Sequence, residues 1–182
     1  PHDLAGQQEL AEKTGMTATF GPAIDFQGGK YGVGILSKQK PLRSRTVPLP
    51  GREERRVLLI AEFPEFVCFC THFSLTPEDR LRSAEIIATE LEKYERMPVF
   101  LAGDFNAEPG DAPIVELEKA WKVLSPDVPT FPADRPVVRI DFVFGAHLSE
   151  WMKVTETRVI DAPVQSDHRP VLVVVRRSVP TP

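Results

Sequence analysis

The chain has 182 residues, of which 42% are hydrophobic and 26% are charged, and its formal net charge is −4. This length fits a single domain over residues 1–182 with a sizeable core, and no apolar run approaches the roughly 18 residues that cross a bilayer. The negative net charge argues against bulk electrostatic affinity for nucleic acid, for which a basic surface is usual.

The first half of the chain predicts one helix followed by short strands. Residues 3–15 show helical spacing of apolar positions, with Asp3 as the amino-terminal cap and Gly15 as the stop. Two strong apolar runs meet at Pro64-Glu65 and predict a hairpin. The extended runs expected in this half are 16–20, 31–37, 42–49, 57–63 and 66–73.

The second half contains the clearest helix, which opens with Thr76 as cap, Pro77 at the first position and acidic residues in the first turn. The wholly apolar run 98–102 predicts a strand that is buried on both faces. The remaining expectations are a short helix at 112–119, irregular structure at 125–136, and strands at 138–144, 152–160 and 170–175. Such an order indicates an α+β fold or a layered α/β/β/α sandwich, and spacing alone does not choose between them.

A basic cluster stands out between positions 38 and 56, opposed only by Glu53 and Glu54. Its members are Lys38, Lys40, Arg43, Arg45, Arg52, Arg55 and Arg56. One interpretation is a solvated hairpin face, and the other is a positive wall beside an anionic substrate. Cys68 and Cys70 lie two apart in an apolar run, so we expect buried thiols on one face of a strand and no metal site there.

Four polar clusters stand at the ends of apolar runs, where functional groups are often placed. They are Thr71-His72, Gly103-Asp104-Phe105-Asn106, Asp141 within Arg139–Phe144, and Ser166-Asp167-His168. A carboxylate in an apolar strand costs several kcal/mol unless it is paired, so Asp141 needs a partner. A histidine would serve, but so would a structural salt bridge with Arg139.

Each of these residues alone has a structural explanation: Asp104 could belong to a turn, and a single histidine is more often structural than catalytic. Together, three carboxylates, a carboxamide and two histidines predict a hydrolytic site. Hard oxygen ligands such as Asp167 suit Mg²⁺ or Mn²⁺. The sequence has no zinc pattern, no Gly-x-Ser-x-Gly elbow and no phosphate-cradling Gly-x-x-x-x-Gly-Lys loop.

In this order the clusters resemble the endonuclease/exonuclease/phosphatase superfamily, which includes the deoxyribonuclease I-like nucleases. The segments that carry the resemblance are Tyr31–Ser37, Thr71–Phe73, Gly103–Asn106, Ile140–Phe142 and Ser166–His168. Thr130–Asp134 through Asp141 looks particularly like the small stand-alone members. The resemblance implies a four-layer α/β/β/α sandwich whose site lies where the two sheets meet at one rim.

The resemblance also implies roles for the site residues. Asp104 would orient or deprotonate the attacking water, and Asn106 would help to position water and phosphate. His168, held by Asp141, would donate to the phosphate oxygens. His72 would contact the phosphate, with Glu54 and Arg56 supporting it from the family's Glu-x-Arg segment, and Asp167 would contribute to the metal site.

One departure from the family pattern bears on metal binding. The strands that end in an asparagine and in the principal metal-binding glutamate precede the segment resembling residues 1–15, and neither is found in the sequence. Either the sequence omits an amino-terminal portion, or two inner strands are missing and metal binding would be weak.

The function expected from the resemblance is Mg²⁺- or Mn²⁺-dependent hydrolysis of a phosphodiester, from nucleic acid or a smaller molecule. Alternatives are an inositol-phosphate type of phosphomonoesterase and a binding module of the same fold without catalysis. We expect no membrane span and a monomer.

Overall fold

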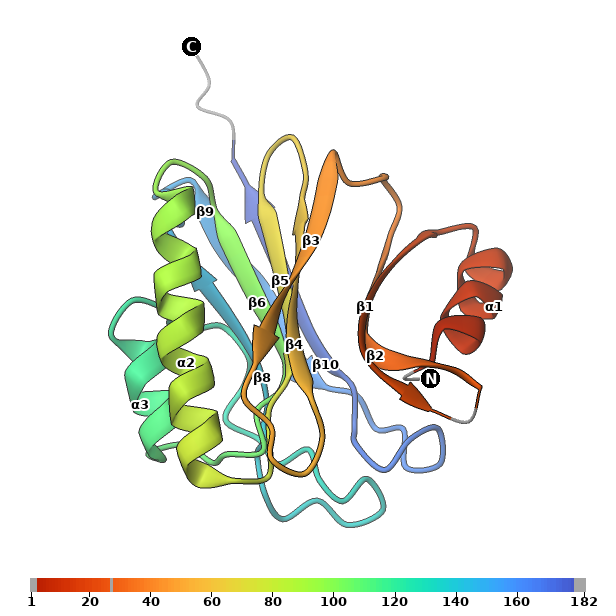
Figure 1. Ribbon diagram of the computed structural model, residues 1–182. Coiled ribbons are helices and arrows are strands. Elements are labelled where there is room, and N and C mark those ends of the chain that lie inside the picture. Colours follow the sequence, from red (N-terminus) through yellow and green to blue (C-terminus); the bar gives the residue numbers. More distant parts are fainter. Residues whose placement is uncertain (1–2, 27, 179–182) are drawn as a thin grey trace.

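The computed structural model describes residues 3–26 and 28–178 and places a six-stranded mixed sheet at the centre (Figure 1). The strand order is β3 (Arg43–Leu49), β4 (Arg56–Glu62), β5 (Val67–His72), β6 (Val99–Asp104), β8 (Asp141–Ala146) and β7 (Lys122–Val123). Strands β5 and β6 are parallel, because helix α2 (Pro77–Leu91) and the short 3₁₀ turn η1 (Glu92–Tyr94) return the chain between them. The other neighbours in this sheet are antiparallel.

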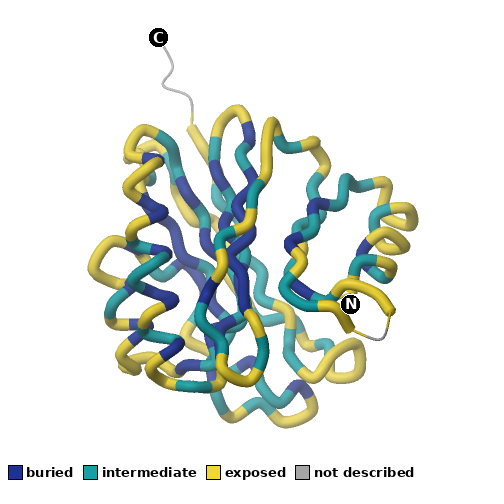
Figure 2. The backbone as a smooth tube through the Cα atoms, in the orientation of Figure 1, coloured by how far each residue is buried: buried dark blue, intermediate teal, exposed yellow. Residues whose placement is uncertain are grey.

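Helices α2 and α3 (Ala112–Glu118) cover one face of this sheet (Figure 1). Buried and half-buried residues alternate along β5, as expected for a strand with its two faces in different surroundings. The buried residues of β5, β6 and β8 meet apolar side chains of the two helices in one core cluster, and the tube in Figure 2 is dark blue along the sheet and the inner side of α2. This burial supplies the main favourable term of folding.

Two separate hairpins and helix α1 (Leu4–Thr14) lie on the other face of the sheet (Figure 1). One hairpin joins β1 (Thr17–Phe26) and β2 (Gly29–Ser37), and the other joins β9 (Met152–Val159) and β10 (Val171–Arg177). Helix α1 packs on the first hairpin, where the buried Gln7 donates its side-chain amide to the Thr19 carbonyl. The order helix, sheet, hairpin layer, helix confirms the predicted α/β/β/α architecture.

Local signals in the sequence correctly predicted the helices. Asp3 caps α1 by accepting from the Gly6 amide, and Gly15 ends it with φ 66°. Pro77 opens α2 as expected, but the Thr76 side chain makes no capping hydrogen bond. Instead, the Glu53 carboxylate accepts from the Leu75 amide beside the helix start. No helix in residues 3–26 and 28–178 is long and apolar enough to cross a membrane.

Two predictions about strands need correction. Strand β6 is not buried on both faces, because Phe100 and Ala102 face the hairpin layer and remain half-buried there. Strand β8 begins at Asp141 rather than at Val138, which instead bridges to Phe131.

The two cysteines lie on the half-buried face of β5, as the spacing predicts, and both are free thiols. Both residues are half-buried, not fully buried as expected. Burial nevertheless raises the pKa of the Cys68 thiol to about 11 and that of the Cys70 thiol to about 12. Both thiols therefore stay protonated near neutral pH, which agrees with a structural role.

Candidate active site

Three of the predicted site residues lie in one row across the sheet. His72 and Asp104 end the parallel strands β5 and β6, and their Cα atoms are paired in register. Asp141 opens β8, which runs antiparallel to β6, so its start pairs with Asp104. Parallel strands that end together and an antiparallel strand that starts there bring the three side chains to the same rim.

His168 joins this row from the loop before β10. Its Nδ1 atom lies 2.8 Å from Oδ2 of Asp141, and its Nε2 atom lies 3.8 Å from Oδ2 of Asp104. Nε2 of His72 lies 3.4 Å from the same Asp104 oxygen. Because a carboxylate oxygen accepts hydrogen bonds, Nδ1 of His168 is the donor of the hydrogen bond to Asp141. The partner that Asp141 required is thus His168, whereas Arg139 pairs with Asp127.

The loop after β6 fixes Asp104 and Asn106 relative to each other. The Asn106 amide donates to Oδ1 of Asp104 at 2.8 Å, and its side-chain nitrogen donates to the Phe73 carbonyl at 3.0 Å. Asn106 adopts φ 46°, a left-handed conformation that asparagine tolerates better than most residues.

A cavity of about 690 Å³ opens over this row. Six predicted site residues line it: His72, Asp104, Asn106, Asp141, Asp167 and His168. The opposite wall comes from α1 and β2, including Gln7, Tyr31 and Leu36. The site therefore lies between the six-stranded sheet and the β1–β2 hairpin, with both sheets contributing to it.

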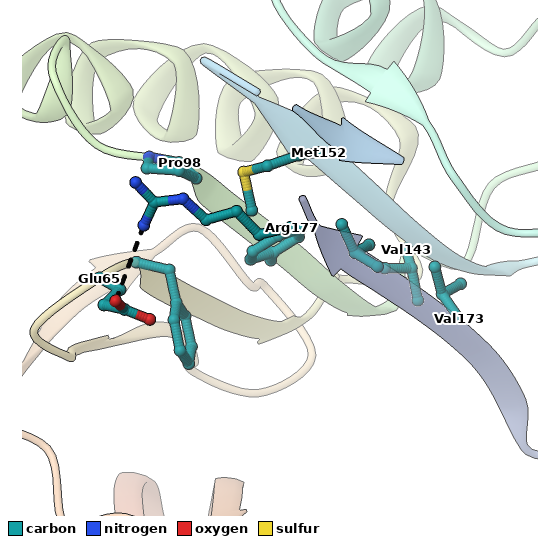
Figure 3. A pocket seen from close by; sticks show the side chains of 9 residues that line it. Glu65, Pro98, Val143, Met152, Val173 and Arg177 are labelled. Atoms are coloured by element: carbon teal, nitrogen blue, oxygen red, sulfur yellow. Dashed lines mark ion pairs between the residues drawn. The ribbon is translucent and has the colours of Figure 1, made fainter. Parts of the chain in front are cut away.

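A second cavity, of about 420 Å³, lies between the other end of the sheet and β10 (Figure 3). Its lining is mainly apolar, as Val143, Met152 and Val173 illustrate. Among the residues drawn in Figure 3, the one ion pair joins Glu65 and Arg177, whose charged atoms lie 3.7 Å apart. It contains no histidine and a single carboxylate in that lining. The groups able to do acid–base chemistry therefore lie in the larger cavity.

Burial and neighbouring charges tune the acid–base groups of the site. Burial raises the pKa of Asp104 to about 6 and the charge of Asp141 adds to this, while the Asn106 amide and the charges of His168 and Arg56 oppose it. Burial lowers the pKa of His168, but the hydrogen bond and charge of Asp141, with the charges of Asp104 and Asp167, raise it above its ordinary value overall. Asp104 can therefore change protonation state near neutral pH, and His168 is more basic than an ordinary histidine.

Glu54 and Arg56 lie beside the row rather than in the main cavity. Oε1 of Glu54 lies 2.9 Å from Nη1 of Arg56, whose side chain is only 7% exposed. Both line a small recess with Tyr31 and His72. The contact of Arg56 with this recess agrees with a supporting position, while the pairing of Glu54 with His72 stays a prediction.

The rest of the basic cluster does not form a wall of the site. Three of its arginines pair with acids: Arg43 with Glu62, Arg45 with Glu90, and Arg52 with Asp79, while Arg55 lines the small recess beside His72. No lysine or arginine is among the residues that line the larger cavity in the described chain. This arrangement favours the interpretation as a solvated face.

Three of the clustered groups could hold a metal ion. Asp104, Asp141 and His168 each offer one ligand atom, and these atoms all lie within 4.8 Å of one another. Asp167 lies on the exposed rim of the same cavity and is not part of that group. Carboxylate oxygens with one imidazole suit Mg²⁺ or Mn²⁺ better than a thiolate-binding metal.

Sequence reasoning missed two residues that support the histidine. The Thr130 hydroxyl donates to Oδ2 of Asp141, and the ring of Phe131 packs on the ring of His168. The segment Thr130–Asp134 stood out in the sequence by its resemblance to small family members, but nothing local assigned it a role. Tyr31, on the opposite wall, lies in another such segment.

Comparison with known proteins gives a family and a fold. The model of the Endonuclease/Exonuclease/phosphatase family matches residues 2–168. None of the curated proteins matches the chain significantly. A mannosyl-6-phosphatase from Bacteroides thetaiotaomicron has a TM-score of 0.75 with 16% identity, and the match covers 95% of this chain and 82% of that one.

Two further solved structures are similar. The human Nocturnin catalytic domain with bound sulfate has a TM-score of 0.74 with 17% identity, covering 94% of this chain and 76% of its own. The D. rerio TDP2 complexed with a single-strand DNA product has a TM-score of 0.73 with 16% identity, covering 95% and 82%. At these identities the likeness establishes the fold.

Proposed function

The chain belongs to the endonuclease/exonuclease/phosphatase family, and on this basis we propose that it hydrolyses a phosphodiester with water activated at Asp104 and with the aid of Mg²⁺ or Mn²⁺. The observation that carries the proposal is the row of His72, Asp104, Asp141 and His168 at one rim of the sheet. Phosphate hydrolysis needs an oriented water, a group to accept its proton and donors around the phosphate oxygens.

Asp104 is the general base in this proposal. A carboxylate whose pKa is raised to about 6 still ionises at neutral pH and is a stronger base than an exposed aspartate. The amide of Asn106 holds one of its oxygens, which leaves Oδ2 to face the two histidines and the cavity. Asn106 would help to position the water and the phosphate with its side-chain oxygen and the loop that it closes.

His168 and His72 would contact the phosphate oxygens. Asp141 fixes His168 as the tautomer with the proton on Nδ1, so that protonation of Nε2 makes it a donor toward the cavity. Its raised pKa increases the protonated fraction near neutral pH. Arg56, held by Glu54, adds positive charge behind His72.

A divalent cation fits the donor chemistry of the site, and when bound it would neutralise charge that develops on the phosphate. Oδ2 of Asp141 is engaged by His168. We therefore assign the cation mainly to Asp167, on the exposed rim, with Asp104 beside the same cavity.

The lining of the cavity favours a diester over a polyphosphorylated monoester. A phosphomonoester of inositol-phosphate type carries several negative charges, which several basic side chains would be expected to meet. The arginines of β3 pair with acids instead, and no lysine or arginine lines the described cavity. A diester carries a single negative charge and needs fewer cationic contacts.

The test compares hydrolysis of bis-(p-nitrophenyl) phosphate and p-nitrophenyl phosphate in the presence of Mg²⁺, Mn²⁺ or EDTA. We expect metal-dependent turnover, faster on the diester, that is lost in Asp104→Ala. Glu118→Ala, which removes an exposed carboxylate at the end of α3 on the other face of the sheet, is the matched control and should keep activity. Absence of both turnover and Mg²⁺ binding would refute the proposal in favour of a non-catalytic binding module.

A further inference from the structure

We propose that Thr130, with the segment Thr130–Ala133, positions His168 for the reaction, acting through Asp141 and through the backbone on both sides of the histidine. The inference rests on the proposed function for its kinetic consequence, but the geometry that carries it is independent of the substrate. The segment lies in the irregular stretch before β8, and Thr130 itself is 1% exposed.

The Thr130 hydroxyl fixes the carboxylate that holds His168. It donates to Oδ2 of Asp141 at 2.5 Å, and Nδ1 of His168 lies 2.8 Å from the same oxygen. Two donors on one oxygen fix the rotation of the carboxylate, so the direction in which it accepts from the imidazole is fixed as well. The amide of Ile140 donates in turn to the Thr130 hydroxyl oxygen at 3.5 Å, which orients the hydroxyl proton toward Asp141.

The backbone of the segment holds the histidine loop from both sides. The Arg169 amide donates to the Thr130 carbonyl at 2.8 Å, and the Ala133 amide donates to the Asp167 carbonyl at 2.7 Å. These bonds involve the residues immediately before and after His168. The Arg169 side chain adds a bond from Nε to the Ala133 carbonyl at 2.7 Å.

These bonds matter because the histidine lies on an otherwise exposed loop. Ser166 and Asp167 are exposed, and a loop of this kind would leave a catalytic side chain free to sample other orientations. The Phe131 ring also lies against the imidazole, with centroids 4.7 Å apart and planes at 43°. Carboxylate, backbone and ring together restrict the imidazole to one orientation toward Asp104.

Thr130→Val tests the hydroxyl, because it keeps the shape and removes the donor, while Thr130→Ser restores the donor without the methyl group. Ser83→Ala is the matched control: it removes another fully buried hydroxyl, which donates to the Asp79 carbonyl at 2.8 Å in α2, away from the site. All variants are first compared with the parent protein by circular dichroism and thermal unfolding.

Two readouts are used. On the preferred ester, Thr130→Val should lower kcat by about 10- to 100-fold, the usual range for a partner of a catalytic or metal-binding side chain, with KM little changed. Thr130→Ser and Ser83→Ala should stay near the parent. The second readout, ¹⁵N–¹H NMR of the His168 imidazole without metal or substrate, should show the Nδ1–H tautomer in the parent and in Thr130→Ser, and a broadened or mixed tautomer in Thr130→Val.

A folded Thr130→Val protein with the parent's kcat and imidazole spectrum would overturn the inference, as would a Thr130→Ser protein impaired as strongly as Thr130→Val. If the parent turns over no ester, the proposed function fails, and the NMR comparison alone decides the positioning role. If Thr130→Val does not fold, Phe131→Leu replaces it: a disturbed imidazole spectrum supports the role of the segment, and an unchanged one refutes it.

Discussion

Replacing Asp104 by asparagine should remove catalysis and at the same time stabilise the fold. The Asp104 side chain is 16% exposed, and its pKa is raised from 3.8 to about 6, mainly by burial and then by the charge of Asp141. A raised pKa in the folded state means that the ionised carboxylate is less favourable there than in the unfolded chain. Asparagine carries no charge, and its side-chain oxygen can still accept from the Asn106 amide.

The magnitude follows from the shift. About two pKa units at roughly 1.4 kcal/mol each set a ceiling of about 3 kcal/mol, and relaxation around a partly solvated site reduces this to about 1–3 kcal/mol. The cost is fully present above the folded pKa of about 6 and absent below the unfolded value of 3.8. The stabilisation by Asp104→Asn should therefore be largest near pH 7.5 and vanish as the pH falls to about 4.

Urea unfolding of the parent and of Asp104→Asn, in EDTA at pH 7.5 and at pH 4, measures this difference. EDTA is required because a bound cation would itself favour the ionised carboxylate. We expect Asp104→Asn to raise the free energy of unfolding at pH 7.5 only, while ester hydrolysis with Mg²⁺ is lost. An Asp104→Asn protein that is no more stable than the parent at pH 7.5, or equally stabilised at both pH values, would contradict the reasoning.

Three further predictions concern residues around the site and core. Burial alone would raise the pKa of Glu53, but hydrogen bonds from its own amide, the Leu75 amide and the Ser74 hydroxyl, with the charge of Arg56, lower it to about 2. The stabilisation from a lowered carboxyl pKa is present above the unfolded value of 4.5 and is lost as the pH falls toward 2. In urea unfolding, Glu53→Gln should therefore lower the free energy of unfolding by about 1 kcal/mol at pH 7, after allowance for solvent screening, and by nothing near pH 2. Arg56→Met removes a charge that lowers the pKa of Asp104, so the acid limb of the pH–rate profile should move to higher pH. An unmoved limb would mean that the charge of Arg56 does not influence the general base. Leu101→Ala, at a fully buried position of β6, should lower the free energy of unfolding by about 2–5 kcal/mol, and a loss below 1 kcal/mol would mean that the core there can collapse around the gap.

Much of the fold could be predicted because its signals are local. Asp3 and Gly15 bound α1, and Pro77 with the following acids opens α2, because capping and the helix dipole act within a single turn. The β5 run was identified by its apolar side chains. The start of β8 was not, because Val138 pairs with Phe131 rather than with β6, and that choice depends on a neighbour in space.

The composition of the site was also visible in the sequence, since the row and its loops are made of the residues that the motif order indicated. Which of them pair was a different matter. On local grounds, Arg139 and a histidine were equally acceptable partners for Asp141. In the structure, the register with β6 places Asp141 beside the His168 loop, while Arg139 forms hydrogen bonds with Asp127 and Ser125.

The sequence by itself determined the helices, most of the strands, the family and the residues that line the larger cavity beside His168, because periodicity, caps and motif order are properties of neighbouring residues. Only the tertiary structure decided that four arginines of the basic cluster pair with acids, that no member lines the larger cavity in the described chain, and that Thr130 and Phe131 hold His168. Those outcomes depend on the parallel pairing of β5 with β6 and the antiparallel pairing of β8, which bring residues far apart in the chain to one rim. No local pattern encodes such a meeting, because it is the sum of many weak packing and hydrogen-bonding terms over the whole sheet.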